Sequence, residues 1–123
     1  MPYINPIVFD SGLTYADTNG TRLDICYGGA EPATYAAATS TASCGNATVN
    51  TGAPQAGAID GRRVVIPAIT AGNVTATQTA AYWALTDGAS TLIATGALTA
   101  PQAVTSGNTF TLDAISITIR AAA

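Results

Sequence analysis

Short runs of alternating apolar and polar residues, separated by Gly, Asn and Asp, make up most of this chain. Alternation with a period of two is typical of strands that bury one face, and Gly, Asn and Asp favour turns. About seven to eight short strands fit this spacing. The pattern therefore predicts a single all-β domain over residues 1–123, a small β-sandwich with Ig-like or Greek-key connections. A small Greek-key barrel is the alternative.

The segment 12–28, GLTYADTNGTRLDICYG, has the pattern of a β-hairpin. A two-residue Asn-Gly loop would mix apolar and polar side chains on each face. A three-residue loop over 18–20 instead pairs Tyr15 with Leu23 and gathers the apolar side chains on one face, which is what fixes register. We therefore expect the three-residue loop, with Gly20 in the left-handed conformation.

Three segments depart from the strand pattern. Residues 1–12 form a candidate N-terminal arm. Residues 32–38 are rich in Ala and begin with Pro32, which suits the first turn of a short helix. Residues 43–61 are rich in Gly, Asn and Ala and predict a long irregular loop. Loops of that length in compact domains are usually functional, so we expect the arm and this loop to contact other chains.

Residues 63–69 carry apolar side chains on both faces of a predicted strand. Such a strand is either central in a sheet or covered by a partner. Pro67 cannot donate a ladder hydrogen bond, which favours an edge position or a bulge. Because edge strands with two apolar faces are typical docking elements, Val65, Pro67 and Ile69 are the candidate interface residues.

Residues 80–99, AAYWALTDGASTLIATGALT, predict a second hairpin that contains the only Trp. A loop over 87–90 would place Trp83 opposite Ala94 and Ala81 opposite Gly96. A large indole over small cross-strand neighbours is a favourable packing, so Trp83 is interpreted as a core anchor. A surface Trp that stacks on a ligand is the alternative.

The last strand pattern, TFTLDAISITIR, changes phase in its middle. Phe110 and Leu112 occupy even positions, whereas the three isoleucines that follow occupy odd ones. One flat strand cannot place both sets on the same face. We therefore expect a bulge near Asp113–Ala114, or a bend at which the strand crosses from one sheet to the other.

Composition narrows the function classes. The chain has four Arg, no Lys, no His, a net charge of −3 and a sequence pI near 4.3, which argues against nucleic-acid binding and against a basic membrane-surface helix. No apolar run is long enough to span a membrane, and the first ten residues lack the pattern of a secretory signal. Although 48% of the residues are hydrophobic, many are Ala. Such a thin core favours completion against further copies of the chain, hence a homo-oligomer.

Catalytic and metal-binding patterns are weak. Without His or Lys, the Ser-His-Asp, Cys-His and Ser-Lys arrangements are excluded, and we expect no enzyme, no cofactor and no metal site. Most carboxylates stand beside Gly, Ser or Asn, as turn-forming Asp does. The run DTNGTRLD, with Asp17, Asn19 and Asp24, loosely resembles a calcium loop but lacks its closing Glu. A hairpin turn explains the same residues.

The chain has two cysteines, Cys26 and Cys44. The alternation that puts Leu23 and Ile25 on the core face points Cys26 the other way, toward solvent. Cys44 lies in the predicted loop. A bond between Cys26 and Cys44 would close a loop of about 19 residues and stabilise by about 3 kcal/mol. The same pattern is also compatible with a bridge between subunits and with two free thiols.

The chain also resembles a known group of proteins. The stretches INPIVFDSGLTYADTNGTRLDICYGGAEPATYAAATS, WALTDGASTLIATGAL and NTFTLDAISITI are similar to small structural proteins encoded among the head genes of tailed bacteriophages and prophages. The resemblance implies a capsid decoration or cement protein, mainly β and commonly trimeric. Its partners would be the major capsid protein and copies of itself. It would be assembled in the bacterial host cytoplasm and would lie on the capsid exterior.

Two rival functions remain open from the sequence. One is a tail, neck or fibre module of a phage that recognises a host surface. The other is a carbohydrate-binding or adhesin module, which would need exposed aromatic side chains. The residues that could serve it are Tyr3, Tyr15, Tyr35 and Tyr82.

Overall fold

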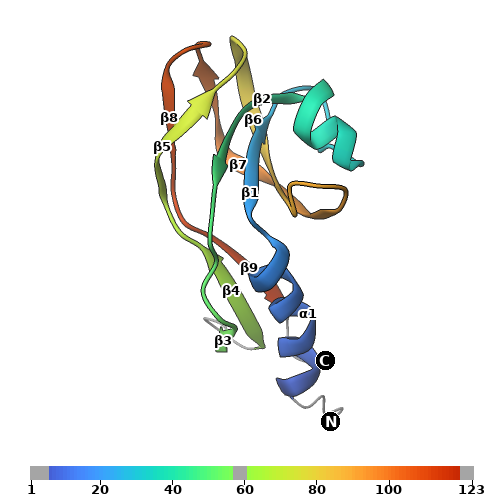
Figure 1. The fold of residues 1–123 in the computed structure, drawn as a ribbon. Helices are drawn as coiled ribbons and strands as arrows, with labels where there is room; N and C mark the ends of the chain where they lie inside the picture. Colours follow the sequence, from blue (N-terminus) through green and yellow to red (C-terminus); the bar gives the residue numbers. More distant parts are fainter. Residues whose placement is uncertain (1–5, 57–60, 120–123) are drawn as a thin grey trace.

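The computed structural model describes residues 6–56 and 61–119, and within them it contains one α-helix, one π-helical turn and nine strands (Figure 1). The helical elements are α1 (Pro6–Asn19) and η1 (Ala37–Thr41). The strands are β1 (Arg22–Cys26), β2 (Ser43–Thr48), β3 (Gln55–Ala56), β4 (Arg62–Ile66), β5 (Ile69–Val74), β6 (Gln78–Thr86), β7 (Leu92–Val104), β8 (Thr109–Leu112) and β9 (Ile115–Ile119).

The strands form two antiparallel sheets that share one core. The larger sheet has the order β7-β6-β1-β2-β5-β8, and the smaller has the order β3-β4-β9. Leu23 and Leu85 of the larger sheet bury in the same cluster as Ile66 of the smaller one. Ile115 and Ile117 pack against that cluster from β9. This arrangement confirms the predicted small all-β, sandwich-like fold.

One long ribbon of two strands runs through both sheets. β4 pairs with β9 in the smaller sheet, and their continuations β5 and β8 pair in the larger sheet. Ile66 pairs with Ile115 and Ile69 with Leu112, so the register is the same on either side of the bend. Residues 67–68 and 113–114 lie at the corner between the sheets (Figure 1). The phase change at Asp113–Ala114 is thus confirmed as a crossing between sheets.

Pro67 stands at this corner rather than within a strand. A proline inside β4 or β5 would remove a ladder hydrogen bond from the ribbon. At the corner no such bond is required, and the fixed φ of proline favours the change of direction. The prediction for Pro67 rested on its missing N–H donor, and that reasoning holds. The proline lies neither at a sheet edge nor in a bulge, but at the bend between β4 and β5.

The first predicted hairpin is wrong, because its first half is the helix α1. Leu13 and Ala16, three residues apart, are buried against Val64 of β4, as one face of a helix requires. Tyr15, predicted to face Leu23 across a hairpin, is instead 48% exposed. Pro6 occupies the first helical position, where a proline is well tolerated. The helix also replaces the predicted arm over residues 6–12, and residues 1–5 lie outside the described part.

Gly20 ends this helix, but it does not adopt the predicted left-handed conformation. It is absent from the glycines with positive φ in the described chain. Its N–H donates to the carbonyl of Ala16 at 2.7 Å. A Cβ at this position would lie 2.5 Å from that same oxygen and 2.9 Å from Cδ2 of Leu85. Glycine is therefore required here because the end of α1 lies close to both the Ala16 carbonyl and the side chain of Leu85, not because a turn needs a left-handed residue.

The predicted loop over 43–61 is also wrong in its first half. Ser43–Thr48 is β2, an interior strand that pairs with β1 along its length and with β5 at Gly45 and Asn46. Gly45 and Asn46 have poor strand propensity, yet pairing on both sides overrides it. Beyond β2, the short strand β3 pairs with β4. Residues 57–60 lie outside the described part.

The short helix predicted near 32–38 is present, with its helical residues at 35–41. The hydroxyl of Thr34 accepts a hydrogen bond from the N–H of Ala37, and the N–H of Ala42 bonds the carbonyl of Ala37 at 2.8 Å. The second bond closes a π-helical turn. Ala38 packs against Cys26 and Ala84, so this segment covers the outer face of β1 and β6.

The hairpin of β6 and β7 has a register two residues away from the predicted one. Trp83 pairs with Gly96 rather than Ala94, and the connection spans 87–91. The loop is therefore one residue longer than predicted. It is held by Asp87, one carboxylate oxygen of which accepts hydrogen bonds from the backbone N–H groups of Ala89, Ser90 and Thr91. The packing of the indole over a small neighbour is confirmed, since the ring of Trp83 lies directly against Gly96, its cross-strand partner. The ring also packs against the core cluster.

Replacing Gly96 with Ala should destabilise the fold by about 1–3 kcal/mol through overpacking. An added Cβ would lie 2.5 Å from Nε1 and 2.6 Å from Cε2 of Trp83, and a rigid ring cannot yield as a flexible side chain does. Urea unfolding followed by Trp fluorescence measures the loss. The matched control is Gly29→Ala, where an added Cβ meets no atom within 4 Å. Equal stability of the two variants would contradict this packing.

Candidate interaction site

A groove opens between β2 and β5, beside the corner of the ribbon. The two strands pair only at Gly45↔Val74 and Asn46↔Asn73 and then separate, because β5 bends toward the smaller sheet. The groove has a volume of about 570 Å³. Its lining consists of Asn46, Ala47, Thr48, Val49, Asn50, Pro67, Ala68, Ile69, Thr70, Ala71 and Asn73.

The groove is neutral, with a polar rim and an apolar base. None of its lining residues carries a charge. Thr48 and Thr70 are exposed, whereas Val49 and Ile69 are buried. A surface of this kind offers backbone and hydroxyl hydrogen bonds together with a small apolar area. It is suited to holding a neutral chain segment.

Two of the three candidate interface residues meet in this groove. Pro67 and Ile69 line one wall, and residues 46–50, from the segment predicted as a binding loop, line the other. Val65 does not reach it. It is half-buried in β4, where it pairs with Ser116. Val64 and Ile66, on one face of β4, are buried against α1 and in the main core, whereas Val65 on the other face is only half-buried. Ile69 belongs to β5. Whether these residues bind another chain stays a prediction.

The outer edge of β7 is a second exposed feature. β7 is a terminal strand of the larger sheet, and its 13 residues, LIATGALTAPQAV, include no charged one. Residues 98–101 form an irregularity opposite Ala81, since Tyr82 pairs with Ala97 and Ala80 with Gln102. Natural edge strands usually carry charges that discourage pairing with another chain. β7 has instead a proline and an irregularity.

A smaller hollow of about 270 Å³ lies beside this irregularity. Its lining includes Trp83, Leu98, Leu112 and Ile115. Trp83 therefore has two roles at once, because one part of the half-buried ring packs on the core and another part borders the hollow. That Trp83 stacks on a ligand stays a prediction, and this hollow is the place where such a ligand would lie against the ring.

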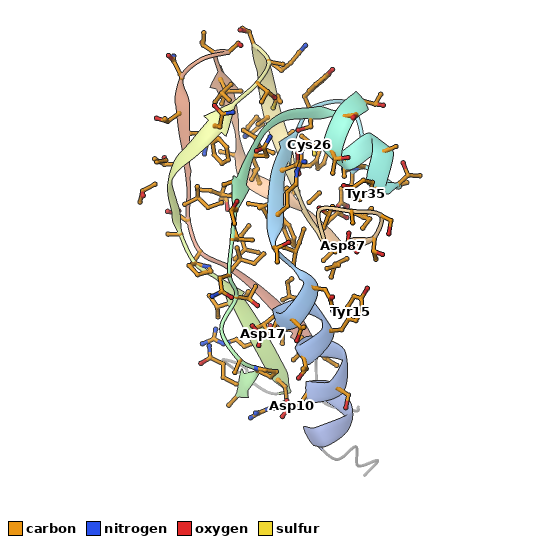
Figure 2. All side chains as sticks on the ribbon, in the orientation of Figure 1. Asp10, Tyr15, Asp17, Cys26, Tyr35 and Asp87 are labelled. Carbon is orange, nitrogen blue, oxygen red and sulfur yellow. The ribbon has the colours of Figure 1, made fainter. Side chains whose placement is uncertain are left out.

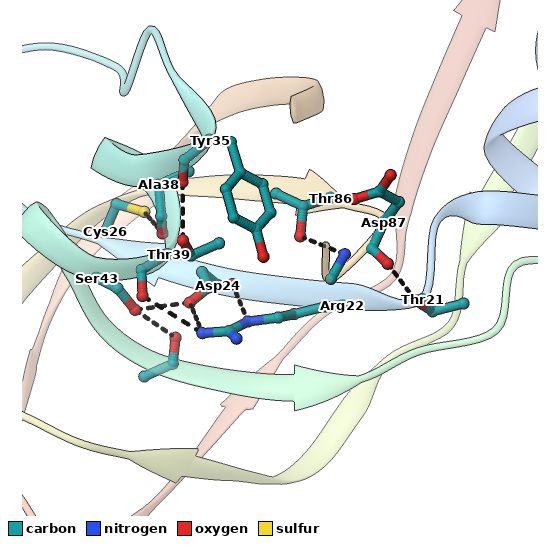
Figure 3. A network of polar contacts seen from close by, with 12 residues as sticks. Thr21, Arg22, Asp24, Cys26, Tyr35, Ala38, Thr39, Ser43, Thr86 and Asp87 are labelled. Carbon is teal, nitrogen blue, oxygen red and sulfur yellow. Dashed lines mark hydrogen bonds and ion pairs between the residues drawn. The ribbon is translucent and has the colours of Figure 1, made fainter. Parts of the chain in front are cut away.

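The strongest polar network lies under the helical segment 35–41 (Figure 3). Arg22 donates two hydrogen bonds to the carboxylate of the fully buried Asp24, at 2.8 and 3.0 Å. Ser43 donates to the same carboxylate at 2.7 Å, and Arg22 also donates to the carbonyl of Thr39. The bond to Asp24 raises the pKa of Arg22 above its ordinary value. The network neutralises a buried charge and ties η1 to the sheet, a structural role.

Asp10 and Asp17 lie on α1 and Asp87 in the loop between β6 and β7, as Figure 2 shows, and each has its own partners. Asp10 forms an ion pair with Arg62 at 2.8 Å, and Asp17 accepts a hydrogen bond from Thr51. The calcium-loop candidates do not converge, because Asp17 and Asn19 belong to the last turn of α1 and Asp24 is bound to Arg22. Within residues 6–56 and 61–119, no group of three or more metal-ligating side chains is present.

Both cysteines are buried free thiols on opposite faces of the larger sheet. Cys44 belongs to the main core, while Cys26 lies with Ala38 and Ala84 beneath η1. The prediction that Cys26 points away from Leu23 is correct, but its predicted exposure is wrong, because η1 covers that face. The three consecutive alanines at 36–38 are the sequence feature from which this covering segment could have been predicted. A bridge from Cys26 to Cys44 is therefore absent, and neither thiol is exposed for a bridge between subunits.

Within the described ranges, no helix is long and apolar enough to cross a membrane. Comparison of the chain with protein-family models, curated proteins and solved structures found no similar protein.

The thiols should be unreactive in the folded protein. Burial raises the pKa of Cys26 to about 12 and also raises the pKa of Cys44, so little thiolate forms at neutral pH. We expect negligible reaction with a thiol-specific chromogenic disulfide reagent at pH 8 and complete reaction of both thiols in denaturant. Non-reducing electrophoresis should show an unlinked chain that migrates as the reduced one does. Rapid labelling without denaturant would contradict the burial.

Stability should fall between about pH 4 and pH 2, partly through Asp87. Backbone N–H groups of Thr91, Ser90 and Ala89 lower the pKa of this carboxyl from 3.8 to about 2 in the folded state. The lowered pKa stabilises the fold above about pH 4, and that contribution disappears as the pH falls toward 2. Asp87→Asn should therefore lower the urea midpoint at pH 7 and lose less than wild type on acidification. Glu31→Gln, at an exposed position, is the control and should follow the wild-type profile.

Proposed function

We propose that this chain is a virion structural protein, a decoration or cement protein that binds the outer surface of a tailed-phage capsid and stabilises contacts between capsomers. The observation that carries the proposal is the presence of two open, uncharged strand surfaces on one small domain. They are the outer edge of β7 and the groove between β2 and β5. The resemblance of the sequence to phage head proteins supplies the biological setting.

Open backbone edges suit a protein that must bind at many equivalent sites. Unpaired N–H and C=O groups can form ladder hydrogen bonds with a neighbour without a specific side-chain code. Because the surfaces that would be covered are uncharged, binding avoids the cost of burying unpaired charges. The net charge of −3 also favours the outside of a capsid over a surface that faces DNA.

The same edges support association between copies, with a trimer as the favoured state. If the edge of β7 contacts a different surface on the next copy, the contact is heterologous, and heterologous contacts form closed rings when the rotation closes. A small domain gains stability from such association.

A tail, neck or fibre module remains the second candidate. The hollow beside Trp83 and the exposed ring of Tyr15 favour it, because aromatic side chains at a surface can contact host glycans or proteins.

Binding to particles separates the two functions. The purified chain is mixed with empty capsids of the phage or prophage that encodes it, and separately with host cells, and both mixtures are sedimented. The decoration function predicts saturable binding to capsids and an increase in their thermal stability. Binding to cells alone would instead support the tail, neck or fibre module, and binding to neither would contradict both functions.

Ala103→Lys in β7 should weaken self-association by about tenfold, a loss of roughly 1.4 kcal/mol, because a charge on an edge strand discourages pairing. Sedimentation equilibrium measures the change. Thr105→Lys adds the same charge at an exposed position just beyond the strand and should have little effect. Equal association of both variants with the wild type would exclude this edge as the contact.

A further inference from the structure

The open part of β2 directs backbone hydrogen-bonding groups into the groove. Along an antiparallel strand, successive residues point their N–H and C=O groups to alternate sides. The N–H of Val49 donates to Thr21 on the side of β1, at 2.9 Å. The carbonyl of Cys44 accepts from Thr75 on the side of β5, also at 2.9 Å. The even-numbered residues of this strand therefore face β5, which places the backbone of Thr48 at the point where β5 has turned away.

The facing strand has unpaired backbone as well. In the pairing of β5 with β8, Ile69 is opposite Leu112 and Gly72 is opposite Phe110. Thr70 and Ala71 therefore share a single opposite residue on β8, the arrangement of a β-bulge. On the groove side, β5 pairs with β2 only at Asn73 and Val74, so neither Thr70 nor Ala71 has a residue of β2 opposite it. Both residues line the groove. Both walls of the groove, β2 and β5, thus supply backbone N–H donors and C=O acceptors that have no partner across the groove.

The shape of the site restricts its occupant. A segment that pairs with both walls must have both of its own edges free. Every described strand of this chain already pairs along at least one edge, so no described strand of a second copy, β7 included, can fill the groove in this way. The occupant must also be uncharged, because the lining offers no charge to neutralise one.

We propose that the groove binds an extended, uncharged segment of a partner protein by β-strand addition. The inserted segment pairs with β2 at Thr48 on one side and with β5 at Thr70–Ala71 on the other. Its apolar side chains, two residues apart, lie on Val49 and Ile69. The inference concerns the groove alone and does not depend on a virion role.

Amide hydrogen exchange of the isolated full chain tests whether the walls are open. The N–H of Thr48 should exchange at least tenfold faster than that of Val49, which is bonded to Thr21. Comparable protection of both amides in dilute protein would show a closed groove and overturn the proposal. Protection of Thr48 that grows with protein concentration would identify a second copy as the occupant and overturn the assignment to a partner protein.

A tethered probe tests strand addition directly. The peptide Val-Thr-Val-Thr-Val is fused after residue 123 through a flexible Gly/Ser linker of about 20 residues, whose mean reach is roughly 25 Å and which gives a millimolar effective concentration. The control fusion carries Val-Pro-Val-Pro-Val, which lacks two of the donors. We expect a higher Tm and at least tenfold slower exchange of the Thr48 amide only in the first fusion. The same behaviour in both fusions would refute strand pairing.

A pair of charge variants locates the effect. Ala71→Asp places a carboxylate in the groove, whereas Ala36→Asp places one on the exposed face of the helical segment. In the Val-Thr fusion, Ala71→Asp should abolish the gain in Tm, and Ala36→Asp should retain it. For each variant, the gain in Tm is the difference between the fused and the unfused protein. A general loss of stability affects both and cancels in this difference. Retention of the full gain in Ala71→Asp would place the probe elsewhere.

Discussion

The bend of the β4–β9 and β5–β8 ribbon at Pro67 is the constraint on which the remaining architecture depends. Hydrogen-bond register continues across the bend, so the two sheets are held in a fixed relation by the strands that link them. The bend lets Ile66 and Ile115 bury in the same core as Leu23 of the larger sheet. It also carries β5 away from β2, which opens the groove. The shared core and the candidate interaction site are therefore two consequences of one change of direction.

Covering the outer face of the larger sheet is the second structural requirement. β1 is buried on both faces, by the main core on one side and by the segment 35–41 on the other. Such a position is hostile to a carboxylate, and Asp24 is accommodated because Arg22 and Ser43 supply charge and hydrogen bonds. The cover holds Cys26 away from solvent. The edges of the larger sheet are formed by its two terminal strands, β7 and β8.

These features fit a protein that works through contact surfaces. The polar groups of the described chain are largely used to tie elements together, as Arg62 ties β4 to α1 through Asp10. Among the open backbone of the described strands are the edge of β7 and the two walls of the groove. Neutral strand edges bind a neighbour through their unpaired N–H and C=O groups. In a lattice, many weak contacts of this kind add up to firm attachment. The decoration role that we propose would use such weak and uniform contacts at the many equivalent sites of a capsid.

The sequence by itself indicated which side chains of these strands face the main core, where the strand alternation breaks, and that the indole lies over a small cross-strand neighbour. Leu23 and Ile25 share the core face, the chain crosses between sheets at Asp113–Ala114, and Trp83 lies over a small cross-strand neighbour. Those features follow from local alternation and side-chain size, which are written in neighbouring residues.

Only the tertiary structure decided the identity of α1, the place of β2 and the exposure of Cys26. Leu13 is followed by apolar residues at both strand and helix spacing, and packing on Val64 selects the helix. The Gly- and Asn-rich β2 is a strand because β1 and β5 pair with it, a long-range effect that local propensity does not report. Cys26 is buried because residues 35–41 return over it, and the groove exists because two strands part. Each of these depends on where distant segments meet, which alternation along the chain does not encode.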